Sequence, residues 1–545
     1  MKSRLLLLAA VAAVALPFLT LVALALGWTS PGPGGDTLGH YAATVLPGYV
    51  ANSVVLAIGS VTLALVVGCA CAWQIERYQF FGRDVLAWAL VLPMAMPAYV
   101  AAYALADFTQ FSGPLQSTLR AHFGWQRGDY WFPEVTSIPG AIICFGFTLY
   151  PYVYLLARSA FAERGRELFD AARSLGLNPR RAWWSAVLPT ARPALVGGGT
   201  LVLMEVLADF GATSYLGVDT LTVGIYRAWY NMSDLASAAR LALALLAVVV
   251  IVHGLEQMAR SRARYASRRS RLEALERLTG RRAVLRGLLC LLPLVVGFLI
   301  PTTLLLRLLT QAEAPVAWMS TLVWTFNSVQ VGVTVAAVTA VIALTLRLRE
   351  RLWHESSAEW LNRILSLGYA VPGAVLALGI LIPLARLDNL LIEWSRQLFS
   401  VSPGLLLTGS ITALVYAISV RLYGIAGNAA SAAFARIPRS LDDSARVLGL
   451  SPLATLKHVH WPLARGTMLA AALLVFVDTL KELPATLALK PFDFDTLATA
   501  TYNLARDERL AEAALPSLLI VLVSLPATML LAGRLRMPGQ RWTAE

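Results

Sequence analysis

Two pairs of acidic residues stand in apolar stretches that are long enough to cross a membrane. They are Glu205 with Asp209, and Asp478 with Glu482, and the second pair repeats the first after 273 residues. A spacing of four residues predicts that each pair shares one helix face. Carboxylates inside a membrane are costly and mark candidate functional sites, and their hard oxygen atoms suit a hard cation. We therefore predict a cation path lined by these four acids, with Lys481 neutralising one of them.

A purely structural explanation of the four acids is also open. The acids could sit at helix ends, or pair with arginines elsewhere in the bundle, without meeting a substrate. In both copies the acids are followed by an Ala-Thr pair, at residues 212–213 and 485–486. This repetition favours the transport interpretation.

A polar, arginine-bearing stretch precedes each acid pair and is duplicated at the same interval, at residues 170–189 and 443–462. In each copy a glycine is suited to the left-handed residue that ends a helix, and a polar residue can cap the next helix. A final proline is expected to end that second helix, because it has no N–H to donate. These residues are Gly176, Asn178 and Pro189 in the first copy, and Gly449, Ser451 and Pro462 in the second.

This pattern of an acid, two small residues, a glycine and a closing proline resembles the cytoplasmic coupling loop of ABC importer permeases. In that family the loop forms a helix that docks into a groove on the ATPase subunit. The resemblance implies this role for Asp170, Ala171, Ala172, Gly176 and Pro189, and for Asp443, Ser444, Ala445, Gly449 and Pro462. The chain departs from the family in having Asp for the usual Glu in both copies, and Ser444 and Trp461 for an Ala and a Leu. The resemblance covers essentially the whole chain.

The second half, around residues 481–499, resembles the fused permeases of ferric-iron importers. This implies a permease that receives ferric iron from a periplasmic binding protein and is driven by a separate ABC ATPase homodimer carrying ATP and Mg. The chain itself is expected to bind no cofactor and no stable metal, with only transient ferric contacts at the four acids. Fused permeases for thiamine and for aminophosphonates share the architecture, and a carboxylate path also suits cationic thiamine, so both alternatives stay open.

The composition is that of a polytopic membrane protein. Of 545 residues, 57% are hydrophobic and 14% are charged. The net charge of +13 is concentrated in short loops, most densely at residues 260–286, as the positive-inside rule expects for cytoplasmic segments. No basic face or aromatic platform accompanies the charge, which argues against nucleic-acid binding.

The hydropathy pattern predicts an all-α protein with about 12 transmembrane helices. Two parallel six-helix repeats are expected at 1–258 and 286–545, joined by a cytoplasmic linker at 259–285. The predicted spans are 5–26, 49–75, 86–107, 137–158, 193–216, 237–258, 286–309, 326–348, 362–384, 405–425, 466–488 and 512–533. The family resemblance implies the type I ABC importer permease fold and the bacterial inner membrane. An even number of spans in each half places both coupling loops and both termini in the cytoplasm.

Further matches between the halves support the duplication. Asn52-Ser53 opens the second span and Asn327-Ser328 the eighth, and Pro97 and Pro372 fall in the third and ninth. We expect an approximate two-fold axis along the membrane normal, and therefore a two-fold partner for the two loops.

Other classes of protein fit the sequence less well. The chain has no Gly-Lys pair, so it lacks the phosphate-binding motif of an ATPase, and ATP hydrolysis is expected on a separate chain. No nucleophile, base and oxyanion set is evident, which argues against an enzyme. A 12-helix secondary transporter could also have two parallel halves, but it needs no paired coupling loop.

Overall fold

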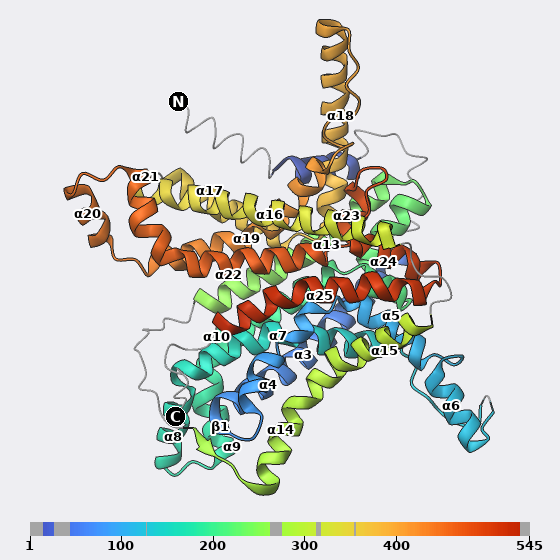
Figure 1. The fold of residues 1–545 in the computed structure, drawn as a ribbon, viewed down its shortest axis with the longest axis vertical. Helices are drawn as coiled ribbons and strands as arrows, with labels where there is room; N and C mark the ends of the chain where they lie inside the picture. Colours follow the sequence, from blue (N-terminus) through green and yellow to red (C-terminus); the bar gives the residue numbers. More distant parts are fainter. Residues whose placement is uncertain are drawn as a thin grey trace.

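The computed structural model describes residues 15–26, 44–126, 128–261, 275–311, 318–353 and 356–534. These residues form an almost entirely helical bundle (Figure 1), as predicted. Among them, nine helices are long and apolar enough to cross a membrane, and a bent helix pair makes a tenth candidate. The predicted first and sixth spans correspond to shorter apolar helices, Ala15–Ala25 and Leu235–Ile251.

In the first half, α3 packs along α7, and α10 lies against both. The helices of this half are α3 (Leu46–Arg77), α4 (Arg83–Ala89), η2 (Leu92–Ala95), α5 (Ala98–Thr109), α6 (Pro114–Phe123), α7 (Ile138–Ala160), η3 (Phe161–Gly165), α8 (Arg166–Ser174), α9 (Pro179–Ala182), η4 (Trp183–Val187), α10 (Leu188–Ala208), α11 (Gly211–Tyr215), α12 (Leu221–Tyr226), η5 (Arg227–Asn231) and α13 (Leu235–Ser261).

In the second half, α16, α19 and α22 pack against one another in the same way. The helices here are α14 (Gly280–Leu294), η6 (Val295–Leu299), α15 (Ile300–Thr310), α16 (Trp318–Trp353), α17 (Ser356–Ser366), η7 (Leu367–Ala370), α18 (Gly373–Phe399), α19 (Ile411–Ala435), α20 (Arg439–Val447), α21 (Pro452–Thr455), η8 (Leu456–His460), α22 (Trp461–Leu480), α23 (Pro484–Leu489), α24 (Leu497–Arg506) and α25 (Leu510–Arg534). A short parallel pairing of β1 (Tyr78–Gln79) with β2 (Glu276–Arg277) joins the end of α3 to the segment before α14.

The two halves repeat their hydrogen bonds as well as their sequence pattern. The side chain of Asn52 donates to the carbonyl of Asp219 at 3.0 Å, and Asn327 donates to the carbonyl of Asp495 at 2.9 Å. The serine after each asparagine accepts from the backbone amide that begins the next short helix, α12 or α24. The matched Asn-Ser pairs therefore hold the same joint in both halves.

The predicted third span is broken rather than straight. The helical segments at 83–95 and 98–123 meet at an angle of 89°. Met96 is extended, with φ −89° and ψ 116°, because the ring of Pro97 disfavours a helical conformation in the residue before it. The predicted ninth span is divided in the same way, since Val371 is extended before Pro372. The matched prolines thus mark a break in each half.

Candidate functional site

Both predicted coupling hairpins, residues 170–189 and 443–462, turn at a glycine in the left-handed conformation. The φ of Gly176 is +86° and that of Gly449 is +75°. In each hairpin the glycine N–H donates three residues back and the next N–H donates five residues back, at 2.9–3.1 Å, which satisfies the last carbonyls of the first helix. Asn178 and Ser451 then cap α9 and α21 through their side-chain oxygens, as predicted.

The prolines that close the hairpins do not end a helix, and this part of the prediction is wrong. Pro189 lies within a 30-residue helical span at 179–208, and Pro462 within a 29-residue span at 452–480. A π-helical turn, η4 or η8, ends two residues before each proline. The wider turn accommodates a residue that has no N–H and a bulky ring. Each hairpin is therefore continuous with the membrane helix that carries an acid pair.

Both hairpins lie on the same side of the bundle. Figure 1 shows α8 and α9 at the lower left and α20 and α21 at the upper left. This is the arrangement expected of two loops that face one partner.

The first hairpin is tethered to the end of α3 by its acid. Arg77 Nη1 lies 2.8 Å from Asp170 Oδ2, and Arg77 Nη2 lies 3.3 Å from Glu276 Oε2. The guanidinium also lies over the ring of Phe169, 4.8 Å from its centroid. Asp170 therefore ties the predicted coupling helix to a membrane helix. Ala172, on the same helix, is buried.

The second hairpin uses Asp442 for this tether, whereas the aligned Asp443 is exposed. Arg351 Nε, at the end of α16, lies 2.6 Å from Asp442 Oδ2, and His460 Nε2 lies 2.7 Å from Oδ1. Burial raises the pKa of Asp442, but the hydrogen bonds from His460 and Arg351 outweigh it and hold that pKa below its ordinary value. The position equivalent to Asp442 in the first copy is Phe169. The coupling role of Asp443 stays a prediction, as a surface residue rather than a tether.

Replacing Asp442 by Asn should therefore destabilise the second hairpin by about 2–3 kcal/mol, because it removes a charge that two buried partners contact. Asp443→Asn is the matched control and should leave stability unchanged. Thermal unfolding of the two purified variants makes the comparison. Equal melting temperatures for Asp442→Asn and the parent would show that the tether is not needed.

Valine at both hairpin glycines should lower transport while the protein still inserts. A Cβ at Gly176 or Gly449 meets no atom within 4 Å, so the cost is backbone strain, about 1–2 kcal/mol at each turn. Asparagine tolerates the left-handed conformation better, and Gly176→Asn with Gly449→Asn is the control. Uptake and ATPase co-purification are measured at equal membrane abundance. Intact transport in the double valine variant would overturn the coupling assignment.

The four predicted acids line one small cavity of about 70 Å³ between the halves. Glu205 comes from the last turns of α10 and Asp478 from those of α22, at equivalent positions of the repeat. Other lining residues include Met94, Met96, Pro97, Tyr99, Tyr152, Arg421 and Lys481. The cavity has room for only a few water-sized groups.

Asp209 and Glu482 do not share a helix face with the acids four residues before them, contrary to prediction. α10 and α22 have already ended, and Asp209 is extended, with φ −70° and ψ 135°. Its Oδ1 accepts from the backbone N–H groups of Ala212 and Thr213 at 2.9 and 3.0 Å. Glu482 Oε1 accepts from the N–H of Ala485 at 3.0 Å. Each of these acids therefore caps the short helix that follows, α11 or α23.

Sequence reasoning missed the basic residue at the centre of this cavity. Arg421 lies within apolar α19, only 8% exposed, and its guanidinium forms an ion pair with Glu482 and lies 3.8 Å from Glu205 Oε1. An arginine in the middle of an apolar helix is a functional signal in its own right. Lys481 Nζ lies 3.1 Å from Asp478 Oδ1, as predicted. Three of the four acids thus have basic partners, as the structural explanation required, and all four line a common cavity as well.

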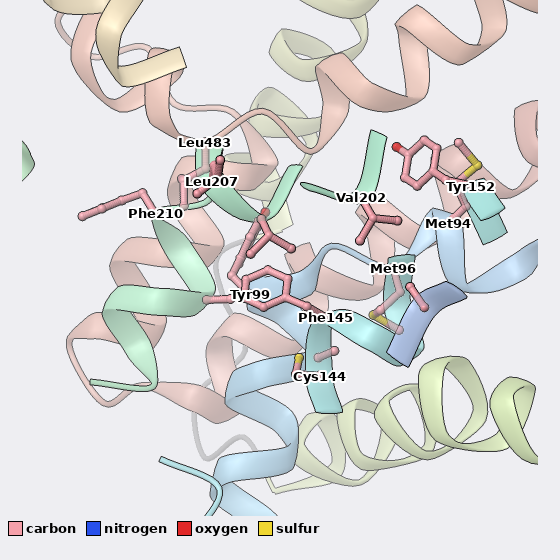
Figure 2. Close-up of a cluster of buried hydrophobic side chains, with 14 of the residues drawn as sticks. Met94, Met96, Tyr99, Cys144, Phe145, Tyr152, Val202, Leu207, Phe210 and Leu483 are labelled. Carbon is pink, nitrogen blue, oxygen red and sulfur yellow. The ribbon is translucent and has the colours of Figure 1, made fainter. Parts of the chain in front are cut away.

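The cavity also holds polar atoms without a partner. Among the described residues, Asp478 Oδ2 and the hydroxyl of Tyr99 are buried and make no hydrogen bond. The hydroxyl of Tyr152 donates to the other oxygen of Asp478 at 3.3 Å. Figure 2 shows Tyr99 and Tyr152 with Met94 and Met96 in the surrounding apolar core. Buried polar atoms without partners are rare, so this cavity is suited to a polar or charged occupant.

Each of the four acids is already engaged by other groups of the protein. Within the part of the chain that the structure describes, no three His, Cys, Asp or Glu side chains come together to hold a metal ion. Oxygens of the four acids instead contact Arg421, Lys481 and backbone amides. An occupant of the cavity would therefore compete with these partners for the acid oxygens.

Comparison with known proteins decides the family. The model of the family described as binding-protein-dependent transport system inner membrane component matches twice, at residues 64–265 and 350–536. The chain belongs to this permease family. The protein is therefore the transport subunit of an ABC importer and a multi-pass inner-membrane protein, and its family works with an ATPase and a periplasmic binding protein.

Relatives of the permease differ in what their names say they transport. The Fe(3+)-transport system permease protein FbpB 2 of Haemophilus influenzae is 25% identical over 482 residues, which is 87% of each chain. The sulfate transport system permease protein CysW of Synechocystis sp. is 32% identical, over 37% of the permease and 72% of the relative. A probable molybdenum ABC transporter permease protein of Haloferax volcanii is 30% identical, over 37% and 73%. Of these three relatives, the one named for Fe(3+) matches along both halves of the permease.

Proposed function

We propose that this permease moves ferric iron from a periplasmic binding protein to the cytoplasm. The observation that carries the proposal is the charge of the cavity lining, in which four carboxylates face two basic groups. Hard carboxylate oxygens suit a small, highly charged cation. The full-length similarity to a permease named for Fe(3+) supports the same substrate.

The same charge balance argues against an oxyanion, although sulfate and molybdenum permeases are among the relatives. Two like unit charges 4 Å apart repel by about 4 kcal/mol near a protein surface. The cavity lining has four carboxylates but only two basic side chains, so it would repel a divalent oxyanion. Thiamine and aminophosphonates remain alternatives that the transport assay below separates from iron.

In this proposal Arg421 and Lys481 occupy the carboxylates while the cavity holds no iron. A ferric ion carries more charge than either side chain and competes with both for Glu205, Asp478 and Glu482. The partner-free Asp478 Oδ2 is the first oxygen available to it. Passage requires contacts weak enough to release the ion. Arg421 and Lys481 would promote this release by pairing again with their carboxylates.

The energy source is proposed to be a separate ABC ATPase homodimer, which binds ATP and Mg while the permease binds neither. The homodimer would dock on both coupling hairpins and close on them together. Both chain termini are proposed to be cytoplasmic, because an even number of spans in each half returns the chain to the side of the coupling hairpins. Damage to one hairpin alone should then stop most transport.

Reconstitution of the permease with its ATPase in vesicles tests the substrate. Candidate periplasmic binding proteins are loaded with ferric iron, thiamine, an aminophosphonate, sulfate or molybdate, and ATP-dependent uptake of each labelled substrate is measured. We expect uptake of iron with a ferric-binding protein. Uptake of another substrate with no uptake of iron would overturn the proposal.

A further inference from the structure

A long apolar groove runs along the outside of the first half, between α3 and α10. Its volume is about 990 Å³, at the upper end of the range for ligand pockets. Along α3 the lining runs from Ile58 to Gln74, about 24 Å of helix. This exceeds the roughly 15 Å that one leaflet contributes to the hydrocarbon core. The groove is therefore long enough to hold an acyl chain across one leaflet.

The wall of the groove is apolar over most of this length. Both helices contribute aliphatic side chains, among them Val61, Leu65, Leu195 and Leu203. Gly199 lies on the floor of the groove, where a Cβ would make ordinary contacts with Val61 and Leu65 at 3.5–3.6 Å. Apolar walls on a membrane-facing surface favour a lipid chain over a soluble ligand.

One end of the groove is strongly basic. Arg180, Arg192 and Arg286 line it, and the lining contains no Asp or Glu. Within the described residues, no carboxylate is paired with any of the three, and Arg286 instead lies over the ring of Tyr78 at 5.0 Å. The charge at this end is thus left uncompensated, which calls for an anionic group.

Because the first hairpin is cytoplasmic in the function proposed above, on which this step rests, the basic end falls at the cytoplasmic surface of the membrane. It is formed by β1, α9, α14 and the start of α10. Figure 1 shows β1 and α9 at the lower left, next to α8, and α14 at the bottom of the view. Trp183 and Trp184 stand there with their rings 5.1 Å apart, and Trp184 is 65% exposed. Tryptophan is enriched at membrane–water interfaces, and basic pockets between membrane helices on the cytoplasmic side bind anionic head groups.

We propose that this groove binds an anionic phospholipid, with its phosphate on the three arginines and one acyl chain along α3 and α10. The first coupling hairpin forms part of the site through Arg180, Trp183 and Trp184. The linker between the halves is itself rich in arginine at residues 260–271, so charge repulsion disfavours it as the occupant. The second half lacks the same set, since Leu453 and Leu456 replace Arg180 and Trp183. The site is therefore expected on one half alone.

Native mass spectrometry of the delipidated full-length permease tests this inference. Phosphatidylglycerol, phosphatidylcholine and inorganic phosphate are titrated separately. We expect phosphatidylglycerol to bind in preference to phosphatidylcholine. The triple variant Arg180→Gln, Arg192→Gln, Arg286→Gln should lose affinity for phosphatidylglycerol on the order of a hundredfold. This assumes that each arginine attracts the phosphate about as strongly as a basic residue near an anionic membrane surface does. The matched control, Arg281→Gln, Arg282→Gln, Arg465→Gln, removes the same charge outside the groove and should bind as the parent does.

A second variant separates a lipid from a free phosphate. Gly199→Leu keeps all three arginines but fills the path of the acyl chain, so it should weaken phosphatidylglycerol binding and leave phosphate binding unchanged. Equal phosphatidylglycerol binding by the parent and the triple variant would overturn the proposal. So would equal affinity for phosphatidylcholine, or displacement of phosphatidylglycerol by inorganic phosphate at the same concentration.

Discussion

Replacing Arg421 by methionine should lower the stability of the permease by about 3–5 kcal/mol, the cost of leaving a buried charge without its partner. Glu482 is 4% exposed and is paired with Arg421, and Glu205 lies within 3.8 Å of the same guanidinium. Removing the cation leaves these carboxylates without their partner in a buried cavity. The abundance of folded protein and its melting temperature in detergent are the measurements.

The partner variant makes this prediction specific. Adding Glu482→Gln to Arg421→Met removes the uncompensated charge, so the double variant should be more stable than Arg421→Met alone. Arg421→Lys keeps the charge but loses the forked geometry, and should fall between the parent and Arg421→Met. If the effects of the two substitutions on stability were simply additive, Arg421 and Glu482 would not be coupled.

Removing the charges of Glu205 and Asp478 together should cut ferric uptake by about tenfold or more, the effect of about 1.4 kcal/mol at the binding step. Glu205→Gln with Asp478→Asn keeps the size of both side chains while reducing their attraction for a cation. Assembly with the ATPase should be unchanged, because the coupling hairpins are untouched. Labelled ferric uptake per molecule of permease in the membrane is the measurement.

A matched pair of substitutions outside the cavity serves as the control. Asp219→Asn with Glu359→Gln also removes one Asp and one Glu charge, each from a largely exposed ion pair, and such pairs contribute little. Its uptake should stay near that of the parent. Unchanged uptake in Glu205→Gln, Asp478→Asn would return these acids to a structural role.

The sequence was sufficient where local chemistry determines the structure. Gly176 and Asn178 act within a few residues of their own position, so a left-handed turn and a helix cap could be predicted without knowing the rest of the fold. The internal repeat then extended the same two predictions to Gly449 and Ser451. The matched Asn52 and Asn327 were also predicted as equivalents, although the carbonyls that they contact are 168 residues or so away.

What could not be predicted depends on contacts between distant segments. Arg421 meets Glu205 across the two halves, and no spacing in the sequence relates them. Asp442 and Asp443 are neighbours of the same type, and only the position of Arg351 determines which one is buried. Pro189 was expected to end a helix because a proline ring clashes with the preceding turn of an α-helix. The wider π-helical turn before it makes room for the ring, so the helix continues.

The helix that continues through Pro189 has a mechanical consequence. Residues 179–208 form a rod of about 45 Å, with the hairpin at one end and Glu205 close to the other. The equivalent rod at 452–480 carries Asp478. A tilt of about 5° imposed at the cytoplasmic end of such a rod displaces its far end by about 4 Å, a distance comparable to the reach of an ion pair. In the proposed transport cycle, a concerted tilt of the two rods would part and rejoin the carboxylates of the cavity.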